Sequence, residues 1–283
     1  MSSPKKRKMD SHQKRKFFGK NQNKKTFMEA GQSGFLVTCN FREKDCVRES
    51  YSVLNEFADM LYGKQECSDS KEIPENNHED AASDEEEIDI SKQLQLDIVK
   101  VQKDFKQKSF RFQLTDNGNI SNCLFIKATV PDVLELGNKI YTEIFETKKS
   151  RTKNVLRFIP VEIVCKASVP DIINAAGKLF DKHLLKEPKT FAIMFNRRLN
   201  NKVSRDDVIK ELADLAASKN INNKVDLKSP QIAIIVEVMK GLCCLSCLPD
   251  FHKFRKYNLV ELVASSNNKT EEVPKETPEK TDI

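Results

Sequence analysis

Apolar side chains near the start of the chain follow first a strand pattern and then a helix pattern. A short apolar run at 35–39 follows Gly34 and predicts a strand. From Glu43 to Tyr62, apolar residues recur three and four positions apart, which predicts one buried helix face. Gly63 then supplies a helix stop. These two elements open a first folded unit.

A second group of elements follows after residue 90. Apolar spacing between Leu94 and Phe105 predicts an amphipathic helix. Strand patterns at 111–114 and 122–126 flank Asp116-Asn117-Gly118, a strong turn sequence. Pro131 then begins a predicted helix that ends near Thr147. Strands and helices alternate here without a fixed period, so we expect an α+β domain.

The predicted α+β domain, residues 31–147, is interrupted by an acidic loop at 64–90. Residues 66–89 contain eleven Asp or Glu and one Lys, without apolar periodicity. Ser83 precedes a run of acidic residues and is a candidate phosphorylation site, where phosphate would compete with RNA for a basic surface. A solvated spacer without a regulatory role is the alternative.

A second module, residues 148–262, is marked off from the first by the charged segment 148–153 at its start. Its predicted elements form an α/β unit: strands at 161–166, 191–195, 232–238 and 242–248, a helix from Pro170, and a helix capped by Ser204. Residues 263–283 are predicted to be a disordered polar tail.

Charge is segregated along the chain in a way that the net value of +6 conceals. Residues 91–264 contain thirty basic and nineteen acidic side chains, so the folded body is more basic than the whole. This asymmetry indicates a nucleic-acid partner, whereas scattered solvated lysines are the alternative. No apolar run reaches the roughly 18–20 residues of a bilayer span, so we expect no membrane partner.

The first thirty residues form a basic tail that is predicted to be disordered. Lys5, Lys6, Arg7 and Lys8 open it, and residues 1–25 contain ten basic side chains against one acidic. Such clusters are typical of nuclear localisation signals and also hold RNA without sequence preference. We therefore expect the protein to be located in the nucleus, including the nucleolus. The alternative is that this tract is only a charged, disordered arm.

The cysteine-rich run at 243–247 contains a CxxC formed by Cys244 and Cys247. Residues three apart on a strand point to opposite faces, so these thiols diverge and do not suit a shared metal or a disulfide. No second ligand pair lies at close spacing, so we expect buried reduced thiols and no metal.

Catalytic and cofactor motifs are missing from the sequence. No GxGxxG, GxxxxGK[ST] or GxSxG is present, and the chain has only eight glycines. The four histidines are scattered. We therefore expect no catalytic residue, no cofactor and no small-molecule substrate.

Basic residues at predicted strand ends and loops of the second module are the candidate RNA contacts. Such positions project into solvent, where cations neutralise phosphates and release counterions. The candidates are Lys166, Arg197, Arg198, Lys202, Lys224, Lys240, Lys253, Arg255, Lys256 and Tyr257. Phe254 and Tyr257 are suited to stacking on unpaired bases. Core packing of these two aromatic rings, and a solvated turn at Arg197-Arg198, are the alternatives.

Several segments resemble the THUMP domain family. They are Arg157–Glu162 with Cys165–Ala167, Phe191–Arg198, Val225–Leu227 with Pro230, and Ile234–Lys240. Leu242–Ser246, Phe254–Leu259 and Gly34–Asn40 are similar to the stand-alone THUMP-domain adaptors that assist the RNA cytidine acetyltransferase. The likeness covers residues 30–262.

The resemblance implies a ferredoxin-like subdomain followed by a THUMP domain. It also implies that the chain binds the acceptor region and 3′ end of tRNA. The expected partners are tRNA, with serine and leucine tRNAs foremost, and the acetyltransferase that makes N4-acetylcytidine in the D arm. Because no catalytic motif accompanies the THUMP segments, we expect the catalyst to act in trans.

Two other functions remain open from sequence. One is an RNA-modifying enzyme that uses Cys247 or His252 with an unrecognised partner. The other is a nuclear assembly factor for ribosomal particles, which the basic tail and acidic loop would also suit.

Overall fold

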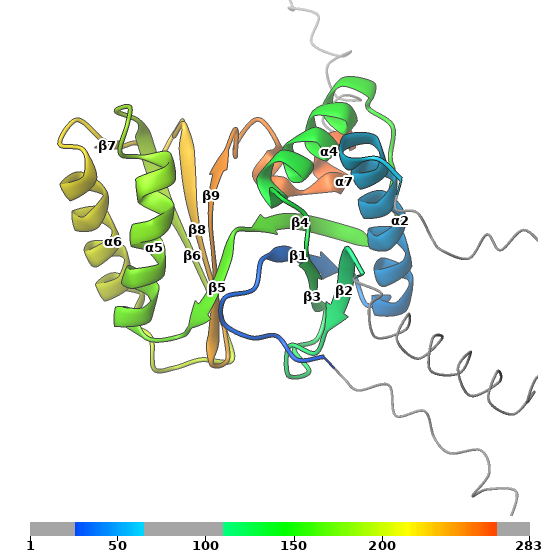
Figure 1. The fold of residues 1–283 in the computed structure, drawn as a ribbon, viewed down its shortest axis with the longest axis horizontal. Coiled ribbons are helices and arrows are strands. Elements are labelled where there is room, and N and C mark those ends of the chain that lie inside the picture. Colours follow the sequence, from blue (N-terminus) through cyan, green and yellow to red (C-terminus); the bar gives the residue numbers. More distant parts are fainter. Residues whose placement is uncertain (1–25, 65–109, 265–283) are drawn as a thin grey trace, which may run out of the picture.

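The computed structural model describes residues 26–64 and 110–264 and contains two β-sheets, each covered by helices on one face (Figure 1). The first sheet is antiparallel, with strand order β2-β3-β1-β4. Its elements are β1 (Gly34–Cys39), α2 (Glu43–Tyr62), β2 (Phe112–Thr115), β3 (Cys123–Ala128), α4 (Val133–Thr147) and β4 (Val155–Val161).

Both helices of the first unit begin or end as their sequences predict. Gly63 follows α2 with a φ of 79°, a conformation in which glycine has no Cβ penalty. The side chain of Asp132 accepts hydrogen bonds from the backbone N–H groups of Leu134 and Glu135, and so caps α4. The structure also contains the other strands and helices predicted for the first unit within the described ranges, and these predictions are confirmed.

The second sheet has the order β5-β9-β8-β6-β7. Strand β6 runs parallel to β7 and β8, whereas β9 is antiparallel to β5 and β8. Its elements are β5 (Ile163–Lys166), α5 (Val169–His183), β6 (Thr190–Arg198), α6 (Arg205–Lys219), β7 (Lys224–Val225), β8 (Ile232–Met239) and β9 (Leu242–Pro249). Ser204 accepts from the N–H of Asp207, as predicted, and Ser168 caps α5 in the same way.

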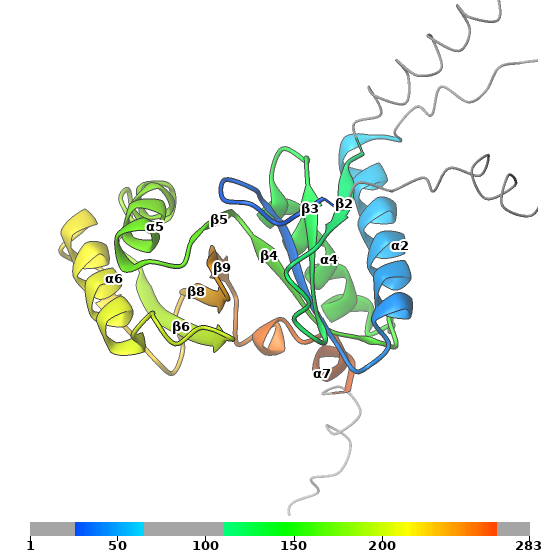
Figure 2. The ribbon, with the colours of Figure 1, turned by 90° about the horizontal axis from the view of Figure 1, so that it is seen from below.

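The two sheets face each other through the surfaces that carry no helices. Figure 2 shows α5 and α6 on the outer face of one sheet, and α2 and α4 on the far side of the other. Met239 of β8 meets Cys123 of β3 between the sheets, with the two sulfurs 3.6 Å apart. One core therefore includes residues from both sheets, and a second core lies under α5 and α6.

The prediction of a single strand at 161–166 was wrong. Residues 155–161 form β4, which pairs with β1, whereas residues 163–166 form β5, which pairs with β9. Glu162 lies between them, so the chain passes from one sheet to the other here. The alternation of side chains continues through Glu162, and periodicity alone does not identify the partner strand. The change of sheet therefore occurs later than the predicted division at 148.

Several predictions fall outside the described residues. They are the basic tract Lys5–Lys8, the helix at 94–105, most of the acidic loop with Ser83, and the tail after residue 264. Within the described ranges, none of the helices has the length and apolar character needed to cross a membrane.

Candidate nucleic-acid interface

Four strands of the second sheet place their ends in one row. Arg198 ends β6 and is paired with Met239 of β8, which is paired with Leu242 of β9. Leu242 is in turn paired with Lys166, the last residue of β5. Because paired residues of neighbouring strands lie side by side, the following loops emerge at the same edge of the sheet.

Five predicted cations belong to this edge, which we call the strand-end row: Lys166, Arg197, Arg198, Lys202 and Lys240. Arg197 Nη1 donates to the carbonyl oxygen of Val203 at 2.9 Å, which holds its guanidinium beside the loop before α6. Lys240 donates through Nζ to the carbonyl oxygen of Gly118, in the turn between β2 and β3. The row therefore extends from the second sheet to the first.

Arg198 differs from the other members because it points between the sheets. Its Nε is buried and has no hydrogen-bond partner among the described residues. Nearby, Glu237 is buried and accepts from Asn196 Nδ2 at 2.6 Å through Oε1. Burial raises the pKa of Glu237, while the hydrogen bond from Asn196 and the charges of Arg198 and Arg157 act in the opposite direction. No signal in the sequence indicated a role for Glu237, because it is a single acidic residue within a predicted apolar strand.

The predicted cations do not all lie at one edge of the second sheet. Lys224 pairs with Thr190, the first residue of β6, and therefore lies at the opposite end of the sheet from Arg198. Strand β9 also ends there, because Pro249 pairs with Ile232. Lys253, Arg255 and Lys256 follow Pro249. Strand β8 has eight residues, so the two ends lie about 23 Å apart at roughly 3.3 Å per residue.

The second basic group lies against the first unit, and we call it the loop group: Lys148, Lys253, Arg255 and Lys256. Lys148 Nζ lies 3.8 Å from the centre of the Phe145 ring, and Lys253 Nζ lies 5.6 Å from it. Lys148 was not among the predicted contacts, because it lies in the charged segment at the start of the second module and joins the loop group only through folding.

Tyr257 is not placed to stack on a base. Its side chain is fully buried, and its hydroxyl donates to the carbonyl oxygen of Pro249 at 3.0 Å. Phe254 is buried beside it, with ring centroids 5.8 Å apart. The structure therefore supports the alternative of core packing for both rings, because the loop after β9 folds back over α4 and buries them.

The two thiols of the CxxC point to opposite faces of β9, as predicted. Cys244 belongs to the core between the sheets, and Cys247 to the core under α5 and α6. The seven cysteines of the described ranges are buried and unbridged.

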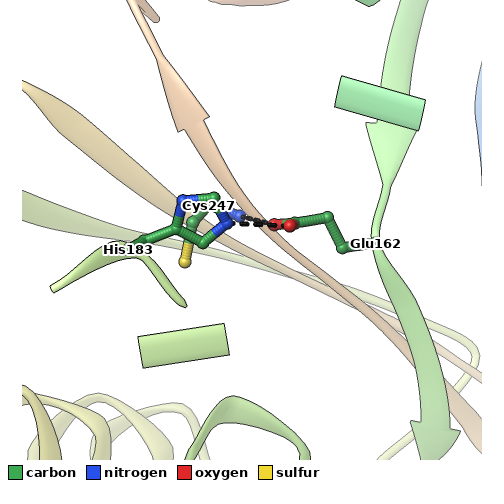
Figure 3. A group of neighbouring side chains, drawn as sticks. All are labelled: Glu162, His183 and Cys247. Atoms are coloured by element: carbon green, nitrogen blue, oxygen red, sulfur yellow. Dashed lines mark hydrogen bonds and ion pairs between the residues drawn. The ribbon is translucent and has the colours of Figure 1, made fainter. Parts of the chain in front are cut away.

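Folding brings Cys247 together with two residues that sequence reasoning did not connect with it (Figure 3). Glu162 Oε1 lies 2.8 Å from His183 Nε2, and Glu162 Oε2 accepts the backbone N–H of Cys247 at 3.0 Å. Lys182 Nζ donates to the same carboxylate at 3.1 Å. These residues come from three separate elements at spacings that match no sequence motif.

Comparison with known proteins finds a domain family that matches the second sheet and relatives that match most of the chain. The THUMP domain family model matches residues 166–248. A THUMP domain-containing protein 1 homolog from Drosophila melanogaster is 42% identical over 275 residues, which is 93% of this chain and 82% of the relative. THUMP domain-containing protein 1 of Bos taurus is 36% identical, covering 88% of this chain and 68% of the relative. The solution structure of the THUMP domain of THUMP domain-containing protein 1 is 37% identical over 28% of this chain and 85% of that chain, with a TM-score of 0.25.

Proposed function

Because the chain belongs to the THUMP domain-containing protein 1 family, we propose that it is a non-catalytic adaptor that binds tRNA and presents it to an RNA cytidine acetyltransferase. The observation that carries this proposal is the strand-end row. Lys166, Arg197, Lys202 and Lys240 are held at one edge of a rigid sheet, and Lys166, Arg197 and Lys202 have no ion pair among the described residues. Cations arranged in this way neutralise phosphates and gain free energy from the counterions that are released.

The loop group gives the RNA a second point of attachment. The separation of about 23 Å exceeds the roughly 8 Å Debye length at physiological ionic strength, so the two groups act independently on phosphates. One phosphate cannot meet both groups, but two segments of one folded RNA can. A tRNA, which presents a helical stem and a single-stranded 3′ end, suits two separated basic groups.

The strand-end row also indicates which parts of the chain contact the RNA. In residues 26–64 and 110–161 the elements follow the order β-α-β-β-α-β, with the sheet order β2-β3-β1-β4, and we assign the first unit to the ferredoxin-like class on that basis. Lys240 contacts the turn at Gly118 in this unit. We infer that both units contact the same RNA, with the ferredoxin-like unit fixing the angle at which the THUMP domain holds it.

The absence of a usable nucleophile at the best candidate positions supports a non-catalytic role. Cys247 is fully buried, and burial raises the pKa of its thiol, so the thiolate needed for attack is disfavoured. His252 is exposed and lies edge-on to Phe251, at the other end of the second sheet from the strand-end row. An enzyme that used Cys247 would have to open the core around it, and one that used His252 would act at the end of the sheet away from the strand-end row.

An adaptor of this kind acts by raising effective concentration. When one protein holds both tRNA and the acetyltransferase, the second encounter becomes intramolecular. The resemblance described above is the reason for expecting serine and leucine tRNAs, N4-acetylcytidine as the product, and action in the nucleus.

The proposal is tested by reconstitution with purified full-length protein, acetyl-CoA, ATP and serine tRNA. We expect no N4-acetylcytidine from this protein alone, a low level from the acetyltransferase alone, and a clear increase when both are present. Acetyl transfer by this protein alone would support the enzyme alternative. Crosslinking in cells separates the remaining possibility: recovery of tRNA supports the adaptor, whereas recovery of ribosomal RNA without tRNA supports a ribosome-assembly factor.

A further inference from the structure

Glu162, His183 and Cys247 form a compact group of three different metal-ligand types. One carboxylate oxygen, one imidazole nitrogen and the Cys247 sulfur lie within 4.8 Å of one another. The residues come from the junction between the two sheets, the end of α5 and strand β9 (Figure 3). The group lies apart from both basic groups described above, and the proposed adaptor function does not use it.

Thiolate, imidazole and carboxylate are the ligands that zinc takes in proteins, at about 2.3 Å for sulfur and 2.0–2.2 Å for nitrogen and oxygen. Tetrahedral zinc therefore separates its ligand atoms by about 3.3–3.6 Å. From separations of at most 4.8 Å, the side chains need only small rotations to reach one ion. His183 and Cys247 lie on packed elements and Glu162 lies directly between two strands, so the ligands are held close together.

Lys182 is the group that would compete with a metal ion. Its Nζ lies 3.1 Å from Glu162 Oε1 and 3.4 Å from Asp132 Oδ2. The Lys182 side chain is 51% exposed, whereas that of Glu162 is 6% exposed. Lys182 can therefore keep Asp132 or turn to water at little cost in solvation, and the remaining contact of Oε1 is then His183 Nε2, which is itself a proposed ligand.

We propose that Glu162, His183 and Cys247 bind one zinc ion, with the fourth position taken by water or another small ligand. On binding, the Cys247 thiol releases its proton to solvent, His183 coordinates through neutral Nε2, and Glu162 coordinates through Oε1. The thiolate and the carboxylate balance the charge of the ion. Zinc would then join α5 and β9 to the junction at which the chain passes between the sheets.

The first experiment measures metal in the purified full-length protein. We expect about one zinc per chain after dialysis against a weak chelator. Replacement of zinc by cobalt should give a thiolate-to-cobalt absorption band in the near ultraviolet. Wild-type protein without bound zinc and without this band would overturn the proposal, whatever the variants do.

Variants then identify the ligands. Cys247→Ser should lose the cobalt band and weaken zinc binding by roughly 100-fold or more, because losing a ligand costs more than the 10–100-fold typical of an outer partner. Cys244→Ser is the matched control, since Cys244 is equally buried on β9 but faces the other core. Lys182→Ala should bind zinc more tightly, because a competing cation is removed. Equal loss of zinc in both cysteine variants, or weaker binding in Lys182→Ala, would contradict the assignment.

Discussion

Tyr141 of α4 and Tyr257 of the loop after β9 are packed ring against ring, with centroids 4.5 Å apart. The Tyr141 hydroxyl donates to the carbonyl oxygen of Tyr257 at 2.8 Å and to that of Phe158 at 3.1 Å. The helix η1 (Arg255–Tyr257) and helix α7 (Leu259–Ala264) follow the second sheet in sequence but pack on α4 and β4 of the first unit. The first unit is therefore completed by a segment that the chain reaches only after the THUMP domain.

Tyr141→Phe should destabilise the protein by about 1–3 kcal/mol, the typical cost of leaving buried polar groups unsatisfied. The substitution keeps the ring and removes the hydroxyl that joins the two buried carbonyls. The free energy of unfolding in urea measures the loss. Tyr62→Phe is the control: the Tyr62 hydroxyl donates to Asp132 from a partly exposed position, where water can replace it, so we expect a smaller loss. Equal losses would mean that the Tyr141 bond has no special role.

Gly137→Ala should destabilise the protein by about 1–3 kcal/mol, the usual cost of overpacking, although alanine favours a helix by about 1 kcal/mol. A Cβ at Gly137 would clash with Cγ of Pro160, so α4 would have to move away from β4. Thermal unfolding checks this.

Gly177→Ala in α5 is the matched substitution, because no described heavy atom lies within 4 Å of the added Cβ. We expect it to stabilise by about 0.5–1 kcal/mol, since glycine loses more backbone entropy on folding. If both alanine variants changed stability in the same direction, the close approach of α4 to β4 would be wrong.

Replacing Arg197, Lys202 and Lys240 together by alanine should weaken tRNA binding and flatten its salt dependence. Each phosphate contact that is lost lowers the log–log slope by roughly 0.7–0.9. Fluorescence anisotropy at several salt concentrations measures the slope. Lys210→Ala, an exposed cation on α6, is the control and should leave the slope unchanged. An unchanged slope in the triple variant would show that the RNA lies elsewhere.

Glu237→Gln should stabilise the protein increasingly as the pH rises. Burial raises the pKa of Glu237, so the folded state holds this proton more tightly than the unfolded chain does. The wild-type carboxyl therefore contributes most stability below its unfolded pKa, and this contribution is lost as the pH rises through the folded pKa. Glutamine does not titrate and can still accept from Asn196.

Urea unfolding between about pH 4 and pH 8 tests this change, at about 1.4 kcal/mol for each unit by which the two pKa values differ. The variant should also bind tRNA more tightly, because a negative charge beside Arg198 is removed. A stability difference that stayed constant across the pH range would contradict the burial argument.

The sequence by itself determined the local elements of this protein. Gly63 and Ser204 mark helix ends through their own backbone or side-chain chemistry, and the alternation along β9 already separated Cys244 from Cys247. These features depend on neighbours within a few residues, so the pattern of the chain contains them. The basic character of the second module was evident in the same way.

Only the tertiary structure decided which segments meet. Strand pairing assigned residues on either side of Glu162 to different sheets, and it divided the predicted cations between two ends of one sheet. It also buried Tyr257 against Tyr141 and brought His183 and Glu162 to Cys247. Each of these contacts joins residues that are distant in sequence, and their energies depend on burial and register, which local spacing does not specify.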